Sequence, residues 1–235
     1  MNQAEQEIEL RAVEFAKKNR TRIGRELSDI KKYPADNQPV SIFMCGSPGA
    51  GKTEASKVFL EAFSDANIIR LDPDELRGYF EDYTGNNSYI FQKGVSFIVE
   101  RTLDFIFKND QSFVLDGTLS NFNIACKNID RSLNRERTVL VIFVYQEPLL
   151  AWEFVQAREK VEGRKIKLET FIEQFLGSQA VIRQIKAKYG DAVKVDLLLK
   201  STDGSPREYR DNIKYIDDHI NKKYSRSELE RLLDL

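Results

Sequence analysis

The chain has 235 residues, with 36 lysines and arginines against 37 aspartates and glutamates, so its formal net charge at pH 7 is −1. Hydrophobic residues make up 41% of it and charged residues 31%, a balance that is typical of a folded globular protein and excludes wholesale disorder. A near-neutral chain lacks the cationic field of a general nucleic-acid-binding protein, so nucleic acid is not an expected partner.

Cysteine and histidine are scarce in this sequence. The two cysteines, Cys45 and Cys126, cannot build a disulfide framework or a cysteine-rich zinc site, which predicts a reducing, cytoplasmic location. The single histidine, His219, leaves little material for histidine catalysis and is expected on the surface of a helix. No apolar run approaches the ~20 residues of a membrane helix, and the N-terminus lacks the apolar core of a signal peptide, so no membrane contact is expected.

The first element in chain order is a helix, predicted over residues 3–31 from an apolar stripe among charged neighbours. Pro34 and Pro39 disfavour helix and separate it from the rest. Beyond them, apolar runs alternate with helical stretches. Strands are predicted over residues 40–45, 67–71, 112–115, 138–145 and 193–199, and helices over residues 53–63, 74–80, 92–108, 121–133, 148–161 and 168–189. Charged helices are expected to end the chain, the last with its leucines buried.

This alternation of strands and helices predicts the α/β fold class, in the form of a three-layer α/β/α sandwich with a mostly parallel sheet and flanking helices. The run over residues 138–145 (TVLVIFVY) is the most apolar of the chain, as expected of a central parallel strand that is covered on both faces.

A glycine-rich motif directly follows the first predicted strand. Its sequence, GSPGAGKT, matches the phosphate-binding pattern G-x-x-x-x-G-K-[ST], and its residues are Gly46, Ser47, Pro48, Gly49, Ala50, Gly51, Lys52 and Thr53. In this pattern backbone N–H groups and the positive end of the next helix bind phosphate oxygens, Lys52 reaches the β- and γ-phosphates, and the Thr53 hydroxyl holds Mg²⁺. The motif predicts a P-loop NTPase that binds ATP or GTP with Mg²⁺.

The rest of the sequence distinguishes among P-loop proteins. A GTPase usually carries an N/T-K-x-D signature, which is absent, and a motor ATPase usually ends an apolar strand in Asp-Glu, where this chain has Asp116-Gly117. A small-substrate kinase needs a carboxylate for the acceptor hydroxyl, polar groups for the substrate and arginines for the transferring phosphoryl group.

Candidates for these three roles occur in order along the chain. Asp72 and Asp74 follow the second predicted strand, and Asp116 and Thr118 follow the third, so both pairs are expected at the ligand-binding edge of the sheet. Asp72 fits a helix cap and a catalytic acid equally well. Arg158 and Arg164 flank a predicted helix end, where basic residues also suit the helix dipole.

Together these segments resemble the zeta-toxin family of P-loop kinases, over about residues 41–199. The resemblance rests on the phosphate loop, the D-x-D of residues 72–74, Glu100, the Asp-Gly-Thr of residues 116–118, and Arg158 with Arg164. It implies ATP-dependent phosphorylation of the 3′-hydroxyl of the amino sugar of UDP-N-acetylglucosamine, and a small antitoxin protein as a partner.

The resemblance also implies a role for each matched residue. Asp74 is the general base, Lys52 stabilises the phosphates, and Thr53 helps to hold Mg²⁺. The residues implied to bind the nucleotide sugar are Glu100, Asp116 and Thr118. The residues implied to neutralise the transferring phosphoryl group are Arg158 and Arg164. This sequence departs from the family in having Asp-Gly-Thr where Glu-Gly-Thr is usual, and a shorter segment between the two arginines.

Three alternatives remain open at this level. The chain could be a P-loop kinase for another hydroxyl acceptor, such as a nucleoside, an antibiotic or a polynucleotide end, or a nucleotide-dependent switch module. The loop over residues 78–88 is either a substrate loop or an ordinary surface loop.

The sequence predicts a single P-loop kinase domain over residues 1–235. It consists of a helical extension (1–39), a kinase core (40–200) and C-terminal helices (201–235).

Overall fold

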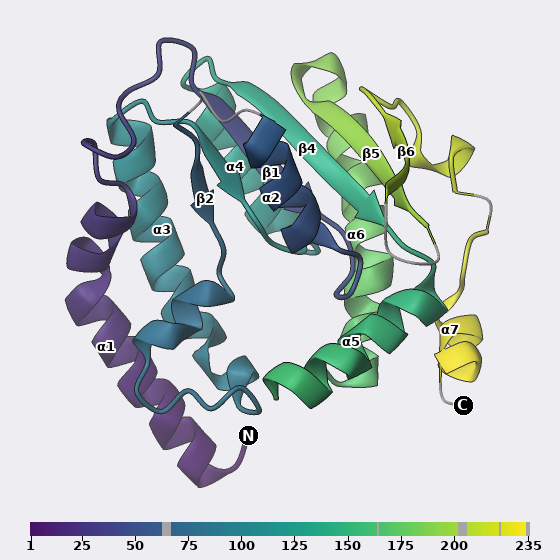
Figure 1. The fold of residues 1–235 in the computed structure, drawn as a ribbon, viewed down its shortest axis with the longest axis horizontal. Coiled ribbons are helices and arrows are strands. Elements are labelled where there is room, and N and C mark those ends of the chain that lie inside the picture. Colours follow the sequence, from purple (N-terminus) through teal and green to yellow (C-terminus); the bar gives the residue numbers. More distant parts are fainter. Residues whose placement is uncertain (63–66, 164, 202–205, 221, 234–235) are drawn as a thin grey trace.

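The computed structural model describes residues 1–62, 67–163, 165–201, 206–220 and 222–233, and in these residues the chain forms a six-stranded sheet (Figure 1). The strands are β1 (Val40–Cys45), β2 (Ile69–Leu71), β3 (Phe113–Leu115), β4 (Thr138–Tyr145), β5 (Lys194–Lys200) and β6 (Pro206–Arg210). The α-helices are α1 (Gln3–Leu27), α2 (Lys52–Ala62), α3 (Gln92–Lys108), α4 (Phe122–Leu133), α5 (Pro148–Glu162), α6 (Leu168–Tyr189) and α7 (Arg226–Leu233). Short 3₁₀ helices are η1 (Glu75–Tyr79), η2 (Ser88–Phe91), η3 (Gly190–Ala192) and η4 (Ile216–Asp218).

The strand order is β2-β3-β1-β4-β5-β6, and the first five strands of this order run parallel. Only β6 pairs antiparallel to its neighbour among the described strands. Parallel strands place their carboxyl ends at one edge of the sheet, and the loops after β1, β2, β3 and β4 all leave from that edge. The phosphate loop and both acidic motifs are therefore brought together.

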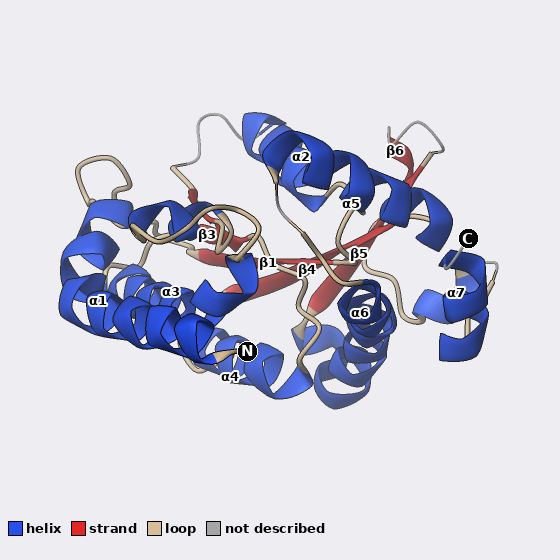
Figure 2. Ribbon diagram, turned by 90° about the horizontal axis from the view of Figure 1, so that it is seen from below, coloured by secondary structure: helices blue, strands red, loops and turns tan. Residues whose placement is uncertain are grey.

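Helices cover both faces of the sheet (Figure 2). The face toward α2 is lined by one apolar cluster, which includes Ile42, Met44 and Ile142. The opposite face packs against α3, α4 and α6 through a larger cluster, which includes Phe43 and Phe113. Alternate residues of the same strands thus bury their side chains on both faces, which confirms the predicted three-layer α/β fold. The helix α5 lies across the carboxyl edge (Figure 1).

The structure differs from the sequence prediction mainly near the C-terminus. The C-terminal segment was expected to be helical throughout, but residues 206–210 form the edge strand β6, which pairs with β5. The polar sequence PREYR carries no strand signal of its own, because this strand depends on pairing with its neighbour. His219 follows η4 instead of lying within a helix. The first helix ends at Leu27 because Ser28 caps it with a hydroxyl hydrogen bond to the Gly24 carbonyl (2.6 Å). Within the described residues, no helix is long and apolar enough to cross a membrane.

Arg137, which directly precedes β4, joins the amino ends of three strands. Its guanidinium donates to the Ser41 hydroxyl (2.8 Å), to the Val40 carbonyl (3.1 Å) and to the Gln111 carbonyl. The residue is 3% exposed, and this burial lowers the pKa of Arg137 to about 10, so the group stays charged at neutral pH.

Replacing Arg137 with methionine is expected to lower the free energy of unfolding by about 3 kcal/mol, because buried acceptors lose their donor. Urea denaturation measures the change. The control is Arg135→Met, which removes an exposed arginine that packs over Phe107 and should cost no more than about 0.5 kcal/mol. Equal midpoints for the two variants would contradict the role given to Arg137.

Candidate functional site

The phosphate loop connects β1 to α2 and adopts a conformation that requires glycine. Gly46 and Gly49 have φ angles of 145° and 72°, in the region that L side chains rarely adopt. A Cβ atom at Gly49 would lie 2.0 Å from the carbonyl oxygen of Ala151, and one at Gly46 would lie 2.3 Å from that of Val144. The loop is therefore packed directly against β4 and α5, which leaves its concave side for a ligand.

Two polar side chains of the loop, those of Lys52 and Ser47, bear on what it can bind. The Lys52 ammonium donates to the Ser47 carbonyl (2.7 Å), so it lies within the curl of the loop. Burial lowers the pKa of Lys52, while the nearby carboxylates of Asp116 and Asp74 act in the opposite direction. The Ser47 hydroxyl is buried and has no hydrogen-bond partner among the described residues. A phosphate oxygen would satisfy both groups, so the loop fits a nucleotide phosphate.

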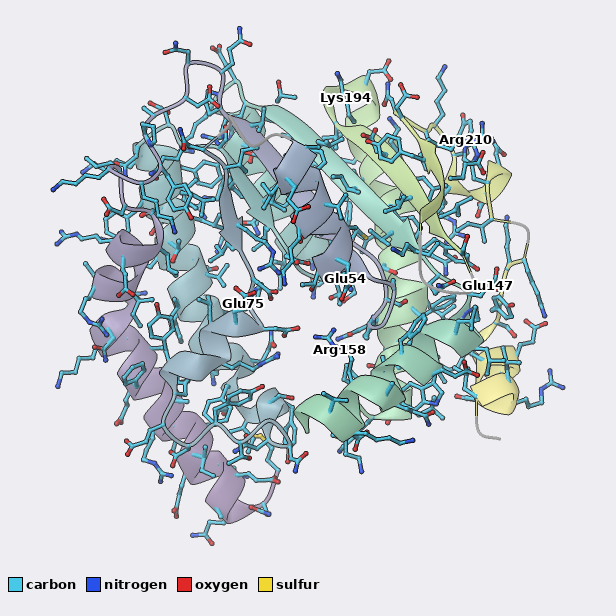
Figure 3. All side chains as sticks on the ribbon, in the orientation of Figure 1. Glu54, Glu75, Glu147, Arg158, Lys194 and Arg210 are labelled. Carbon is cyan, nitrogen blue, oxygen red and sulfur yellow. The ribbon has the colours of Figure 1, made fainter. Side chains whose placement is uncertain are left out.

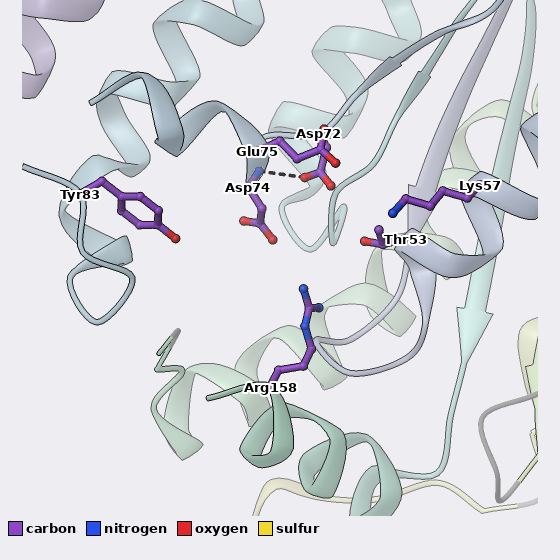
Figure 4. Close-up of a pocket in the computed structure, with 7 residues that line it drawn as sticks. All are labelled: Thr53, Lys57, Asp72, Asp74, Glu75, Tyr83 and Arg158. Atoms are coloured by element: carbon purple, nitrogen blue, oxygen red, sulfur yellow. Dashed lines mark hydrogen bonds between the residues drawn. The ribbon is translucent and has the colours of Figure 1, made fainter. Parts of the chain in front are cut away.

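A cavity of about 300 Å³ opens beside this loop (Figure 4). It brings together parts of the chain that are far apart in sequence, and its lining residues are Thr53, Lys57, Asp72, Asp74, Glu75, Tyr83 and Arg158. Arg158 extends from α5 (Figure 3), and its side chain points across the cavity toward that of Asp74, which comes from the loop after β2 (Figure 4). The cavity thus presents a carboxylate, a hydroxyl and cations next to the phosphate loop.

The two acids of the D-x-D motif have different surroundings. Both Asp72 oxygens are used within the protein, because Oδ1 accepts the Asp74 backbone N–H (2.8 Å) and Oδ2 accepts from Arg70 (2.6 Å). Its side chain is 7% exposed, whereas that of Asp74 is 39% exposed. Burial, reinforced by Asp116 and Asp74, raises the pKa of Asp72. Both acids line the cavity, but Asp72 is engaged as a cap of the turn, whereas Asp74 is the more exposed of the two.

Asp74 is held by an arginine of the next turn. Arg77 donates through Nη1 to Asp74 Oδ1 and through Nη2 to Gln92 Oε1 (3.3 Å). Its side chain is 10% exposed, so the pair lies at the buried rim of the cavity. Arg77 thus fixes one carboxylate oxygen of Asp74 through a charge-assisted hydrogen bond.

The three residues implied to bind a nucleotide sugar lie in different environments. The Thr118 carbonyl accepts the Gly46 N–H (3.3 Å), which places Thr118 beside the phosphate loop. The Asp116 carboxylate is 3% exposed, and its Oδ2 accepts from Ser56 (2.9 Å) and Arg70 (2.8 Å). Glu100 is on the exposed side of α3, where it forms an ion pair with Lys127 of α4 (2.6 Å). The structure therefore brings Thr118 and Asp116 close to the loop, but not Glu100.

Of the two arginines predicted at the site, Arg164 lies outside the described residues, so only the position of Arg158 is given. Arg158 lines the cavity described above and also a second one of about 420 Å³, which extends along the other side of the phosphate loop. The second cavity is lined by Gly49, Ala50, Gly51, Glu54, Gln146, Phe154, Ala157, Arg158, Val161 and Lys200. Arg158 is thus positioned at the junction of the two cavities.

Sequence reasoning did not identify Lys57, Tyr83 and Arg70 as site residues. Lys57 lies one turn after Thr53 on α2, so its helical position could have indicated it. Tyr83 belongs to the loop over residues 78–88, where the substrate-loop alternative was left open. Arg70 interrupts the apolar strand β2, and a charged residue in a strand with apolar neighbours is a signal for a buried ion pair.

Comparison with known proteins agrees with this geometry. Residues 24–214 match the model of the zeta toxin family. A structure from the PezAT chromosomal toxin–antitoxin system of the human pathogen Streptococcus pneumoniae covers 100% of this chain and 89% of its own at 15% identity, with a TM-score of 0.65.

Two structures of the AvrRxo1-ORF1:AvrRxo1-ORF2 complex share the fold. The native complex covers 87% of this chain and 69% of its own (14% identity, TM-score 0.54), and the complex with ATP covers 87% and 65% (14% identity, TM-score 0.53). Among curated proteins, none matches the sequence significantly. The family match spans most of the chain, so the chain belongs to the zeta toxin family of P-loop proteins and is a phosphotransferase with a hydroxyl acceptor.

Proposed function

We propose that this protein transfers the γ-phosphate of ATP to a hydroxyl of a nucleotide sugar, the 3′-hydroxyl of UDP-N-acetylglucosamine. The observation that carries the proposal is the cavity in which Asp74 and Arg158 face each other beside Thr53 of the phosphate loop. Lys52, the residue before Thr53, is near enough to both to interact with them electrostatically. A phosphate-binding loop with a carboxylate and an arginine directed at the same space suits phosphoryl transfer to a hydroxyl.

Four residues have a defined task in the proposed reaction. The acceptor oxygen bonds to the γ-phosphorus, the bond from that phosphorus to the bridging oxygen of ADP breaks, and the hydroxyl proton passes to Asp74. Lys52 neutralises charge on the β- and γ-phosphates, and Arg158 neutralises charge on the transferring group. Arg164 keeps its predicted supporting role as part of the proposal.

The donor set of the cavity fits Mg²⁺. Thr53 supplies a hydroxyl oxygen, and three acids, Asp72, Asp74 and Glu75, line the same cavity together with Lys57 and Arg158. Mg²⁺ prefers hard oxygen ligands and takes most of them from phosphates and water, so one protein hydroxyl is enough. When bound, the ion would neutralise phosphate charge and orient the phosphate chain.

The second cavity supports a place for the nucleoside part of ATP. It starts at the glycines of the phosphate loop and extends along α5, where Phe154 and Val161 give it apolar walls. One AvrRxo1 structure of the same fold was solved with ATP. We therefore assign ATP as the phosphate donor, and GTP as the competing nucleotide to be tested.

Family membership supports the nucleotide sugar as acceptor and an antitoxin as a protein partner. The PezAT structure belongs to a toxin–antitoxin system. Thr118 and Asp116 are proposed on the sugar side of the site, and Glu100 stays a prediction from the family resemblance. The single-domain organisation over residues 1–235 is part of the same proposal.

The acceptor is identified by mass spectrometry of reactions that contain the purified chain, Mg²⁺, ATP or GTP, and one candidate acceptor. The proposal expects one added phosphate on UDP-N-acetylglucosamine and none on UDP or N-acetylglucosamine alone. A product only with a nucleoside or another hydroxyl compound would contradict the sugar assignment and leave the kinase class intact. Nucleotide binding without turnover, with every acceptor, would favour the switch alternative.

Tyr83 is expected to contribute to acceptor binding. Its ring is held edge-to-face on Phe91 (centroids 5.7 Å apart), and its hydroxyl points into the cavity near Asp74 (Figure 4). Tyr83→Phe removes only this hydroxyl, so KM for the acceptor should rise by about tenfold through loss of one hydrogen bond while KM for ATP stays constant.

The matched control is Tyr79→Phe. The Tyr79 hydroxyl donates to Glu26 of α1 (3.3 Å), outside the residues that line the cavity. Steady-state kinetics should give wild-type constants for this variant. Equal acceptor KM values for Tyr83→Phe and the wild type would exclude the phenol from acceptor recognition.

A further inference from the structure

Arg70 is a nearly buried arginine in β2 to which the reaction above assigns no task. Its side chain is 13% exposed. It donates through Nη2 to Asp72 Oδ2 (2.6 Å) and Asp116 Oδ2 (2.8 Å), through Nη1 to Glu75 Oε1 (2.7 Å), and through Nε to the Ser56 hydroxyl (3.1 Å). One guanidinium therefore contacts groups from α2, from η1 and from the loops that follow β2 and β3.

The partners of Arg70 are themselves connected to the reacting groups. Asp72 accepts the backbone N–H of Asp74, so Arg70 reaches the proposed base through one intermediate side chain. Ser56 lies on α2, the helix that begins with Lys52 and Thr53, and its hydroxyl also donates to Asp116 (2.9 Å). The cluster thus links the base, the phosphate-loop helix and the end of β3.

We propose that Arg70 is a positioning residue for phosphoryl transfer, which fixes the backbone of Asp74 through Asp72 and fixes α2 to the end of β3 through Asp116 and Ser56. The inference rests on the proposed function, because it takes Asp74 as the base. Displacement of a reacting group by about 1 Å can cost about 10²-fold in rate, so this connection has a kinetic consequence.

Arg70 also balances the charge of two buried carboxylates, those of Asp72 and Asp116. The Asp72 and Asp116 side chains are 7% and 3% exposed, and Arg70 is the cation that contacts both. Loss of Arg70 would leave two buried carboxylates close together, and one of them would take up a proton at higher pH than before. The other charged groups that face this pair are Lys52, Lys57, Asp74, Glu75 and Arg158.

A purely structural ion cluster is the competing explanation, and Arg137 provides the matched control. Both arginines are buried in the same sheet, but Arg137 bonds to Ser41 and to backbone carbonyls before β4, and contacts none of the site residues named above. Arg137→Gln should therefore lower stability without altering catalysis by the folded protein.

The test compares Arg70→Gln, Arg70→Lys, Arg137→Gln and the wild type, each assayed well below its own Tm. Arg70→Gln is expected to lower kcat by about 10²-fold, to leave KM for ATP nearly unchanged, and to move the acid limb of the pH–rate profile to higher pH. Arg70→Lys keeps a cation and is expected to recover most of the kcat and the wild-type acid limb. Arg137→Gln should show a lower Tm with wild-type kcat and pH profile.

Two results would overturn the inference. One is an Arg70→Gln variant that, once folded, has the kcat and pH profile of Arg137→Gln, and the other is an Arg70→Lys variant as slow as Arg70→Gln. The assay follows transfer to whichever acceptor the wild type phosphorylates, or ATP hydrolysis where water is the acceptor. The test of Arg70 therefore remains valid if the sugar assignment fails. A wild type that turns over no ATP would instead contradict the proposed function.

Discussion

Replacement of Asp74 by asparagine is expected to lower kcat by about 10²–10⁴-fold, because the acceptor hydroxyl loses its general base. The asparagine keeps the size of the side chain and can still accept from Arg77, so the fold of the turn should persist. Affinity for ATP should stay close to that of the wild type, because the phosphates are proposed to bind Lys52 and the loop amides and not Asp74. Single-turnover phosphoryl transfer and an equilibrium ATP titration measure the two quantities separately.

Asp82→Asn is the control for Asp74. Asp82 is an acid of the following loop and forms an exposed ion pair with Arg11 of α1 (2.9 Å). Its neutralisation changes the net charge by the same amount without touching the cavity, so transfer rates should remain at the wild-type level. Loss of a general base should lower kcat by at least about 10²-fold. If Asp74→Asn kept more than about a tenth of the wild-type kcat, Asp74 would not be the base.

Replacement of Lys52 by methionine is expected to lower kcat by at least about 10³-fold, because a preorganised cation at the developing phosphate charge is lost. Methionine keeps much of the length of the side chain but cannot donate to Ser47 or to a phosphate. Rapid-quench measurement of phosphoryl transfer at saturating ATP gives the effect on the chemical step. Lys188→Met, which removes an exposed lysine paired with Asp130 on α4, is the matched control.

The lowered pKa of Lys52 leads to a prediction for the activity at alkaline pH. Burial lowers its pKa, so the group loses its proton at lower pH than an ordinary lysine. The charged form is the one that stabilises phosphate, and activity should therefore decline as pH rises toward that lowered pKa. A wild-type rate that stays constant through the ordinary titration range of lysine would contradict a role for its charge.

Elements with a strong local signal could be predicted from the sequence. The strand over residues 138–145 and the helix over residues 168–189 have the predicted bounds, because continuous apolar runs and helical periodicity survive in any tertiary context. The phosphate loop could also be predicted from the sequence, since its backbone conformation requires glycines. The strand β6 could not be predicted, because this edge strand owes its conformation to pairing with β5.

The acids of the site mark the limit of sequence reasoning. Asp72 and Asp74 are equally plausible bases by position, and what distinguishes them is that Arg70 and a backbone N–H occupy both oxygens of Asp72. Asp116 is likewise engaged by Ser56 and Arg70, groups that are distant in sequence. Glu100 has the expected spacing, but the orientation of α3 places it on an exposed face against Lys127.

Residue types at fixed local spacing were enough to predict the fold class, the family and the presence of a phosphate-binding loop. The tertiary structure was needed to show that Asp72 caps a turn while Asp74 is the more exposed acid of the pair, that Arg158 lines two cavities, and that Arg70 contacts Asp72, Asp116 and Ser56. These properties depend on which side chains from distant segments occupy the same space, and spacing along the chain carries no such information. The chain as a whole is nearly neutral, yet acids and cations from α2, β2, η1, α5 and the loops after β2 and β3 gather at the carboxyl edge of the sheet.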